Sequence, residues 1–412
     1  MATEREAADV LVIGGGLAAL CAAISARQAG VSVLMAEAAP RELRGGNTRH
    51  SRNLRIMHSV PSAAIPGAYS EAEFMDDVVK ASQGACDETL AGVLVRQSAA
   101  LPSWLANHGV VFQTEHIPFS RKTAFFLGGG KAAINALYAA AECMGVRVLY
   151  GHAVEAIEAR DGAEWPFRAR SIIACCGGEQ ANTASHGYIN RGTPFAKGEI
   201  LRSLLNQGVA SVGNAEAGHL VAVDARFSDP DGGIVTRIDG LEHGIAVDLA
   251  GRRFQDETAI KGPTRYAVWG RLIAELPERR AVLILDAEGF RKIPPFALPP
   301  FQAHTLSELA FQLRTDGGAV EHSAKESGRV ASPPFFAFPM RPGIAFTCLG
   351  VKVDEKARVV RVGGLPCAGL FAAGMIMAPN ILGAGYLAGG GMSIGAVFGR
   401  IAGEEAARHV LG

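Results

Sequence analysis

Residues 9–37 read DVLVIGGGLAALCAAISARQAGVSVLMAE, an order of residue types that predicts a strand, a glycine turn, a helix and a second strand. This spacing matches the dinucleotide-binding fingerprint of a βαβ unit. Gly14 permits the tight turn, Gly16 lets the backbone approach a pyrophosphate, and the small Ala19 lets the helix pack closely on the strand. The stretch therefore predicts a dinucleotide site at the N-terminus of the first helix.

The acid that ends this stretch narrows the choice of dinucleotide. Glu37 lies at the tip of the second strand, where a carboxylate suits a pair of hydroxyls on an adenosine ribose and repels a 2′-phosphate. NADP is therefore disfavoured. The free N–H groups of the first helix favour phosphates. The alternative is a glycine-rich turn in an ordinary parallel sheet.

Composition limits the classes of protein to which the chain can belong. Its 412 residues are 49% hydrophobic and 19% charged, as in ordinary globular proteins. Its 40 Lys and Arg residues balance its 40 Asp and Glu residues, so nothing favours nucleic acid or an anionic membrane. No signal peptide and no apolar run of about 18 residues is seen. We expect a cytoplasmic protein with reduced cysteines, although Cys175 and Cys176 leave a redox role open.

The residue composition of the rest of the chain changes in its middle, where prolines become frequent. The loop at 41–55 is polar and basic, with five arginines. An apolar run at 171–178 ends on two glycines, as a second nucleotide-facing strand would. The expected segments are a dinucleotide-binding first part at 1–221, an inserted proline-containing domain at 222–335 and a return to the first domain at 336–412, which ends in a strand and in a helix at 392–410.

Several longer motifs, in order along the chain, carry a resemblance to a known family. They are GGNTRHSRNLR (45–55), AFFLGGGKAAINALY (124–138), RGTPFAKGEILRSLLNQG (191–208), DGGIVTRIDG (231–240), RYAVWGRL (265–272), RPGIAFTCLGVKVDE (341–355) and the glycine-rich C-terminal block from 369. With these motifs the chain resembles the fumarate reductase/succinate dehydrogenase flavoproteins, and within them the FAD-dependent tricarballylate dehydrogenases.

The resemblance implies an α/β fold, in which a Rossmann-like FAD-binding domain carries an inserted α+β capping domain. It also implies noncovalent FAD, a small anionic substrate and an electron-accepting redox partner. Carried over by motif, the expected cofactor-binding residues are Gly14, Gly16, Ala19, Glu37, Gly46, Asn47, Thr48, Val154, Gly177, Gly374, Met375, Gly390, Gly391 and Met392.

The chain departs from the family pattern at five places. Met375 stands where the family has a glutamate that bonds FAD hydroxyls. The stretch GIAFTCLG lacks the active-site histidine of fumarate reductases, and the position of their final-loop arginine falls on Tyr386. Ketosteroid dehydrogenases also place a tyrosine there. The segments after Ile157 and after Leu313 are shorter than in the family, which favours a reduced cap.

Four residues are the expected catalytic group. By resemblance, Arg265 is the proton-transferring arginine, Thr236 and Arg237 bind substrate, and Tyr386 polarises a carboxylate or carbonyl oxygen. An arginine can move a proton only where it is shielded and paired with acids. His50, His58 and His219 are candidate relays or ordinary structural histidines, and no metal-ligand spacing occurs.

These expectations combine into one function with two alternatives. The first is an FAD-dependent dehydrogenase or reductase of a C–C bond in a small polycarboxylate, of the tricarballylate to cis-aconitate type, with hydride transfer to flavin N5. One alternative is the flavoprotein component of cobalamin (precorrin-3B) biosynthesis. The other is a degenerate FAD-binding protein without catalysis, which Met375 and the short cap would explain.

Overall fold

The structure is a computed structural model that describes residues 7–115, 121–158, 169–182, 187–227, 231–262 and 265–412. Within it the chain divides into two compact units. Unit 1 comprises 1–182, 195–218 and 346–412, and unit 2 comprises 183–194 and 219–345. The inserted domain was expected at 222–335. The structure begins this unit three residues earlier, continues it to Ala345 and adds the short segment before Pro194.

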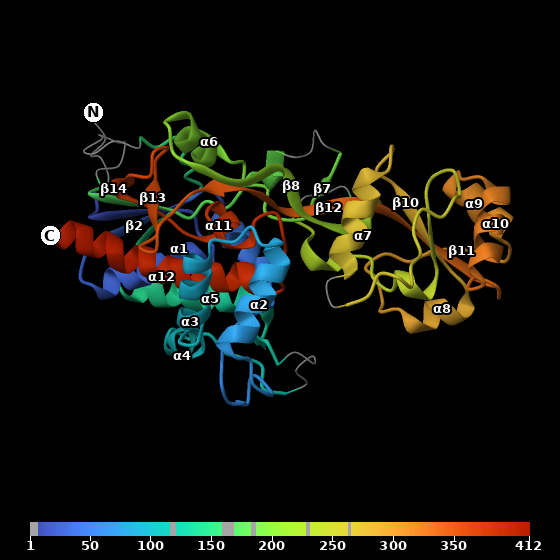
Figure 1. Ribbon diagram of the computed structural model, residues 1–412, viewed down its shortest axis with the longest axis horizontal. Coiled ribbons are helices and arrows are strands. Elements are labelled where there is room, and N and C mark those ends of the chain that lie inside the picture. Colours follow the sequence, from blue (N-terminus) through green and yellow to red (C-terminus); the bar gives the residue numbers. More distant parts are fainter. Residues whose placement is uncertain (1–6, 116–120, 159–168, 183–186, 228–230, 263–264) are drawn as a thin grey trace. The chain divides into compact units, whose positions relative to one another are not determined.

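Unit 1 is built on a six-stranded sheet with the order β13-β14-β6-β1-β2-β5 (Figure 1). β1 (Val10–Ile13) lies between β6 (Ser171–Ala174) and β2 (Val33–Glu37), and it is parallel to both. Every residue of these three strands is buried. Such uniformly buried strands are typical of a parallel sheet that is covered on both faces. The prediction of an α/β fold with a Rossmann-like domain is confirmed.

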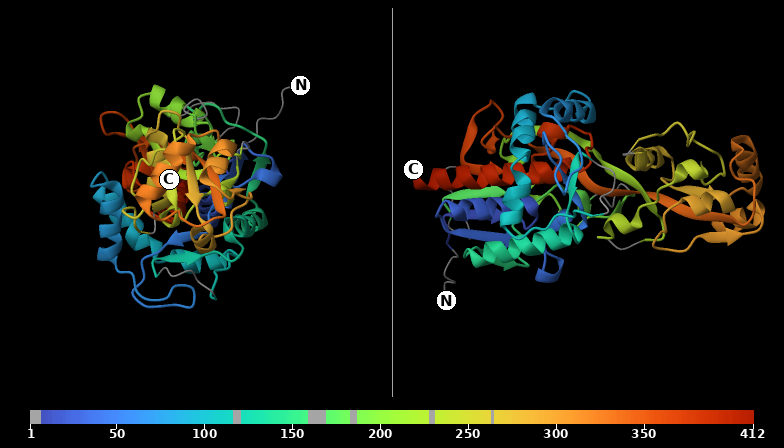
Figure 2. Two further views of the ribbon diagram at one scale, coloured as in Figure 1. Left: turned by 90° about the vertical axis from the view of Figure 1, so that its right-hand side faces the viewer. Right: turned by 90° about the horizontal axis from the view of Figure 1, so that it is seen from below.

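The first and the last helix of the chain pack closely because their facing residues are small. α1 (Leu17–Gln28) and α12 (Gly390–Leu411) run side by side, as Figures 1 and 2 show. A Cβ on Gly399 would lie 2.4 Å from the Ala18 carbonyl oxygen, and one on Gly403 would lie 2.2 Å from that of Ala22. Only glycine allows this approach, which joins the two ends of the chain.

The other elements of unit 1 surround this framework. They are η1 (Arg41–Leu43), η2 (Gly46–His50), β3 (Asn53–Arg55), α2 (Glu71–Ser82), α3 (Glu88–Ser98), α4 (Leu101–Asn107), β4 (Thr123–Phe125), α5 (Gly129–Cys143), β5 (Arg147–Tyr150), α6 (Glu199–Asn206), β13 (Arg358–Val360), β14 (Pro366–Ala372), η6 (Gly374–Ile376) and α11 (Pro379–Leu382). The C-terminal helix thus starts two residues before the expected 392.

Unit 2 has a second sheet, with the order β11-β12-β10-β9, and β7 and β8 also pair with β12. Its elements, with the two strands that run into unit 1, are β7 (Ile189–Asn190), β8 (Ser211–Asp224), η4 (Gly233–Thr236), η5 (Leu241–His243), β9 (Ile245–Val247), α7 (Arg265–Glu275), β10 (Ala281–Leu285), α8 (Ala287–Lys292), β11 (Phe301–Ala303), α9 (Leu306–Leu313), α10 (Gly317–Ser327) and β12 (Phe335–Val351).

Alternation along β10 gives unit 2 an apolar core on each face of its sheet. Leu283 and Leu285 pack with Trp269 of α7, whereas Val282 and Ile284 pack with residues of α9 and α10. Successive side chains of a strand point to opposite faces, which explains the division. One face thereby fixes α7, the helix that begins at Arg265.

Candidate active site

The glycine turn of unit 1 is shaped by the strand beside it. Gly14 has φ +112°, and a Cβ there would lie 2.5 Å from the Cys175 carbonyl oxygen at the end of β6. Gly16 is the residue before the first turn of α1. A Cβ on Gly46 would have only the Gly16 Cα within 4 Å, at 4.0 Å. A Cβ on Gly16 would lie 3.4 Å from the Thr48 hydroxyl oxygen, so the loop at 45–48 approaches the N-terminus of α1 closely.

Four loops that follow strands meet at one edge of this sheet. Gly14 follows β1, Glu37 ends β2, Gly177 follows β6 and Gly374 follows β14. Parallel strands expose their carboxyl ends at the same edge, and ligands of open α/β sheets bind there. The structure thus brings together four of the residues that the sequence singled out for the cofactor.

Glu37 lies directly beside the glycine turn. Its side chain is buried and accepts a hydrogen bond from the Ala39 amide at 2.8 Å. A Cβ on Gly15 would lie 1.9 Å from Glu37 Oε2 and 2.2 Å from the Tyr138 hydroxyl oxygen, so a larger residue there would displace these side chains. Burial raises the pKa of Glu37 from 4.5 to about 7, and the Ala39 amide opposes that rise. An acid in this environment gains from a ligand that donates hydrogen bonds to it.

The loop at 45–48 lies against the start of α1. The Thr48 hydroxyl accepts a hydrogen bond from the Leu17 amide at 3.0 Å, which satisfies one free N–H of the helix. Asn47 is half-buried in the same loop. The family resemblance places Gly46, Asn47 and Thr48 by the flavin ring. The structure shows Gly46 and Thr48 beside the N-terminal end of α1, and Ala19 fully buried within that helix.

The N-terminus of α12 contains three of the remaining residues expected to bind the cofactor, and Met375 lies beside it. A Cβ on Gly391 would lie 3.4 Å from the Met375 sulfur, so Met375 lies next to the first turn, which also contains Gly390 and Met392. Gly389 precedes it and accepts a hydrogen bond from the Arg55 amide at 3.2 Å. Val154 is half-buried after β5.

Arg55 holds the loop before α12. Its Nε donates to the Ala388 carbonyl at 3.0 Å, and its guanidinium contacts the Asp77 carboxylate and the Tyr69 hydroxyl, each at 2.8 Å. Since its side chain is 9% exposed and paired with Asp77, it serves to position this loop.

Tyr386 lies in that loop between two fixed points. A Cβ on Gly385 would lie 1.7 Å from the Ala81 carbonyl, and one on Gly389 would lie 2.9 Å from the Arg55 amide nitrogen. The Tyr386 side chain is half-buried, and its ring centroid is 6.3 Å from that of Phe346. The glycines anchor the loop, so Tyr386 has a defined position.

Unit 2 contains a cluster of arginines bridged by carboxylates. Arg265 contacts Asp239 at 3.3 Å and Glu242 at 3.2 Å, and Arg237 contacts the other oxygen of Asp239 at 3.2 Å. A cation at a helix N-terminus is unfavourable, so Arg265 at the start of α7 needs these acids. Arg265 Nε and Glu242 Oε2 are buried without a hydrogen-bond partner among the described residues. We call Arg237, Asp239, Glu242 and Arg265 the arginine cluster.

The neighbours of the arginine cluster are also polar and buried. Thr236 is buried, and its hydroxyl donates to the Gly233 carbonyl at 3.0 Å. Arg191 donates to the same carbonyl at 2.9 Å and 3.2 Å. Burial, Arg191 and Arg237 lower the pKa of His219 to about 3. His219 is therefore a neutral imidazole, able to donate or accept a hydrogen bond beside two cations.

Sequence reasoning found Arg265, Arg237 and Thr236 but not their acidic partners. Asp239 and Glu242 lie two and five residues after Arg237 in the sequence. They could have been predicted, because an arginine that moves a proton needs acids paired with it. His58 instead contacts the Ile56 carbonyl at 2.8 Å, and His50 lies in η2.

The described residues also bear on whether the protein could hold a metal ion or cross a membrane. In that part of the chain, no group of three or more His, Cys, Asp and Glu residues could hold a metal ion. Among its helices, none has the length and apolar character needed to cross a membrane.

Comparisons with known proteins agree with this architecture. Residues 9–393 match the family model described as FAD binding domain. The probable fumarate reductase Ifc3 of Shewanella frigidimarina is 24% identical over 471 residues, covering 100% of this chain and 76% of the relative. The NADH:fumarate oxidoreductase of Klebsiella pneumoniae is 25% identical, over 98% of this chain and 48% of its own length.

Solved structures show the same fold. The open conformation of a flavocytochrome c3 fumarate reductase matches with a TM-score of 0.80 at 21% identity, covering 100% of this chain and 80% of the other. A 3-ketosteroid-Δ4-(5α)-dehydrogenase from Rhodococcus jostii RHA1 matches with a TM-score of 0.72 at 20% identity, over 99% and 98%. With the glycine turn, the buried acid and the family match in place, the chain belongs to the FAD-binding-domain family of fumarate reductase-type flavoproteins, and it is an FAD-dependent oxidoreductase.

Proposed function

We propose that this protein dehydrogenates, or in reverse reduces, a C–C bond in a small polycarboxylate, with tricarballylate and cis-aconitate as the type pair. The observation that carries the proposal is the arginine cluster, in which the Asp239 carboxylate bridges Arg237 and Arg265. The whole chain has no net charge, so a charged substrate must be bound by local residues such as these. Guanidinium groups bind carboxylates through paired hydrogen bonds. Arg237 stands where fumarate reductases keep an acid, which favours a substrate with one more carboxylate than fumarate.

The reaction removes a proton and a hydride from adjacent carbons and leaves a double bond between them. FAD, when bound, supplies the acceptor of the hydride and its two electrons, and a separate electron acceptor must reoxidise it. The protein must take up the proton that is alpha to a carboxylate and stabilise the negative charge that develops there. We assign the proton to Arg265, which gives one of its own guanidinium protons to Glu242 or Asp239 as it takes the proton from the substrate carbon.

This assignment rests on how Arg265 is held. An arginine in water stays protonated and cannot act as a base, but the Arg265 side chain is half-buried and has two carboxylates within 3.3 Å that can accept its proton. Its Nε and Glu242 Oε2 have no partner within the described chain, so each can take a further hydrogen bond. His219, neutral and beside Arg237, supplies a hydrogen bond to a substrate oxygen without adding charge.

The test is anaerobic mixing of the FAD-loaded protein with tricarballylate, followed through the visible absorbance of the flavin. We expect tricarballylate to bleach the flavin and succinate to bleach it far more slowly. A flavin that no polycarboxylate reduces would overturn the proposal. Reduction or oxidation of a corrinoid in place of polycarboxylates would support the cobalamin-pathway alternative.

A matched pair of variants on α7 tests the role of Arg265. Arg265→Lys should slow flavin reduction by roughly 10²–10⁴-fold, the usual contribution of a positioned acid–base group. FAD content should stay normal, because the glycine turn and Glu37 belong to unit 1. The control is Arg271→Lys, on the exposed side of the same helix. Equal rates in the two variants would remove Arg265 from the chemistry.

A further inference from the structure

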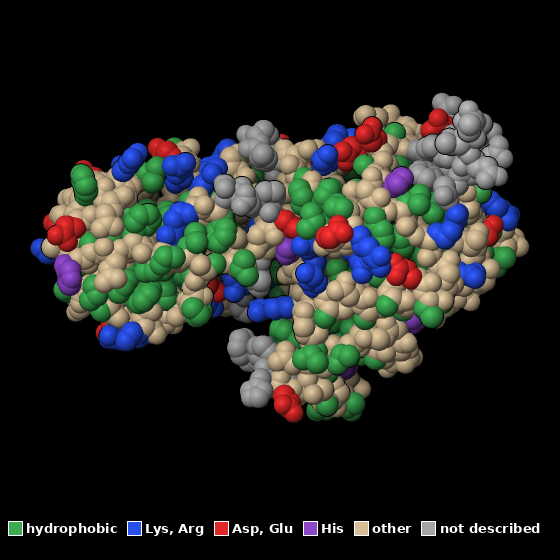
Figure 3. All heavy atoms as spheres, turned by 180° about the vertical axis from the view of Figure 1, so that it is seen from behind, with side chains coloured by type: hydrophobic (Ala, Val, Ile, Leu, Met, Phe, Trp, Pro, Cys, Tyr) green, Lys and Arg blue, Asp and Glu red, His purple; other side chains and the backbone are tan. Residues whose placement is uncertain are grey.

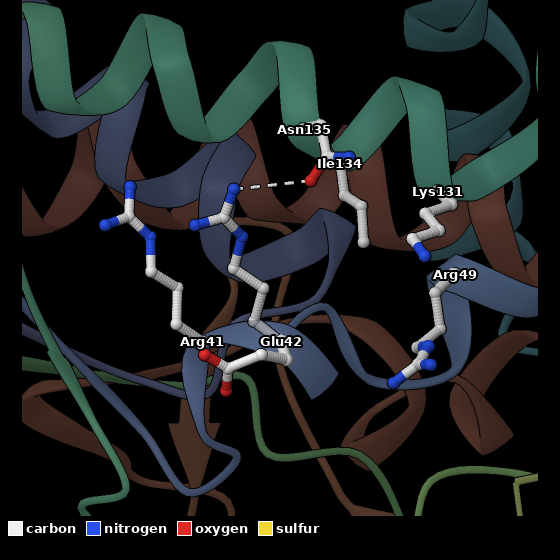
Figure 4. A pocket seen from close by; sticks show the side chains of 7 residues that line it. Arg41, Glu42, Arg49, Lys131, Ile134 and Asn135 are labelled. Atoms are coloured by element: carbon white, nitrogen blue, oxygen red, sulfur yellow. Dashed lines mark hydrogen bonds between the residues drawn. The ribbon is translucent and has the colours of Figure 1, made fainter.

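A basic pocket lies in unit 1 between the segment that follows β2 and the helix α5. Its volume is about 270 Å³, and it is lined by Arg41, Glu42, Arg44, Arg49, Lys131, Ile134 and Asn135. Figure 4 shows side chains of α5, among them Lys131 and Asn135, facing Arg41 and Arg49 of the opposite segment. We call the seven lining residues together the basic pocket.

The basic pocket has excess positive charge. It has four cationic side chains and one acid, Glu42. Within the described parts of the chain, Arg41, Arg44 and Lys131 make no ion pair. Elsewhere charges are mixed, and on the face drawn in Figure 3 basic and acidic side chains are interspersed. A concentration of uncompensated cations in a hollow raises the local potential and favours an anion.

Arg44 is held in place by neutral groups. Its guanidinium donates to the Tyr150 hydroxyl at 3.0 Å and to Asn135 Oδ1 at 3.3 Å. The guanidinium carbon lies 4.3 Å from the centroid of the Tyr138 ring, in a cation–π contact. These contacts fix the fork without neutralising it, so little ordering is needed when an anion binds.

The other cations of the basic pocket come from both of its sides. Arg49 donates to the Leu43 carbonyl at 3.0 Å, which directs it along the wall of the pocket. Lys131 is exposed on α5, and Arg41 has only a distant contact, 6.0 Å, with the Tyr150 ring. Three guanidinium groups and an ammonium can thus surround one compact ligand, with Ile134 as an apolar wall.

We propose that the basic pocket binds a small phosphoryl anion, a phosphate group or a pyrophosphate, at a site distinct from the glycine turn. Planar guanidinium forks match the oxygens of phosphate groups, and Lys supplies a point charge. The volume is just below the range of pockets for drug-sized ligands, so the ligand is a compact anion or the phosphate end of a larger one. A flat acidic protein surface would not fill such a hollow.

The experiment is calorimetric titration of the FAD-loaded protein with inorganic pyrophosphate at low and moderate salt. FAD occupies the glycine turn, so pyrophosphate cannot bind there. We expect one saturable site whose affinity falls as salt rises. Arg44→Gln and Lys131→Gln should each weaken binding by about tenfold or more, because a charged hydrogen bond is lost. Lys80→Gln, at an exposed position on α2, is the matched control and should bind normally.

Lys131→Gln keeps the test valid if Arg44→Gln fails to fold, since the Lys131 side chain is exposed. Absence of saturable binding to the wild type would overturn the proposal. So would equal binding by wild type and Lys131→Gln. If polyaspartate bound at this pocket and pyrophosphate did not, the pocket would be a docking site for an acidic protein, and the proposal would again be wrong.

Discussion

The glycine turn of unit 1 and the arginine cluster of unit 2 are built in opposite ways. The turn takes three consecutive glycines and one acid within the span 9–37. The cluster takes its arginines from two segments, at 237 and at 265, and depends on Asp239, which the first motif contains, and on Glu242, which lies outside both motifs. At Gly14 in the turn, backbone geometry excludes every other residue type. In the cluster, the requirement is that arginines and acids pair in space. The number of residues between them along the chain is not fixed by that requirement.

The largest effect we expect concerns the turn. Gly14→Ala should abolish FAD binding, because its Cβ would lie 2.5 Å from the Cys175 carbonyl oxygen and φ is +112°. The matched control is Gly30→Ala, at φ +95° with no atom within 4 Å of the added Cβ. There only the positive φ is unfavourable, so a loss of about 1–2 kcal/mol in the free energy of unfolding is expected. Flavin absorbance per mole of purified protein measures the difference, and full flavin in Gly14→Ala would contradict it.

The bridging acid of the arginine cluster should matter next. Asp239→Asn leaves Arg237 and Arg265 without their shared carboxylate, so the rate of flavin reduction should fall by about 10²-fold or more if the acid relays the proton. Flavin content should not change. Asp256→Asn, at an exposed acid of the same unit, is the control. A lower affinity for substrate with an unchanged rate would show that Asp239 only orients the arginines.

Tyr386 gives a sharper test of loop geometry. Tyr386→Phe keeps the ring near Phe346 and removes the hydroxyl donor. If that hydroxyl stabilises developing charge on a substrate oxygen, flavin reduction should slow by roughly 10²-fold, as for loss of one oxyanion donor. FAD binding should stay as in the wild type. A normal rate of flavin reduction in the Tyr386→Phe variant would leave this role to the arginines alone.

Local patterns therefore predicted more of this molecule than long-range ones. The βαβ unit at 9–37 and the strand at 171–178 could be located because strand, turn and helix are neighbours in sequence. The pairing of Arg265 with Glu242 could not, since it depends on where η5 and α7 lie in the folded unit. The pairing of Arg55 with Asp77 could not be predicted either, because Asp77 comes from a helix with no motif of its own.

The smallest expected effect is a pH dependence that originates in Glu37. Burial raises the pKa of this carboxyl to about 7, above its ordinary value of 4.5. In the ligand-free protein, the stabilising effect of the protonated form is fully present below pH 4.5 and is lost as pH rises through about 7. Through this group alone, the ligand-free protein should be less stable at about pH 8 than at about pH 5. Glu37→Gln should remove that difference.

Binding of FAD should make the ionised form of Glu37 the favoured one, in place of the protonated form. Ribose hydroxyls donate hydrogen bonds to an ionised carboxylate, so they favour the charged form and lower its pKa. FAD should therefore release a proton from Glu37 when it binds below pH 7, and its affinity should rise with pH until it levels off above about pH 7. Titrations of deflavinated protein with FAD, in buffers of different ionisation enthalpy, count the released protons. If Glu37→Gln released the same number, the acid would not face the ribose, and the turn would bind its ligand through backbone groups alone.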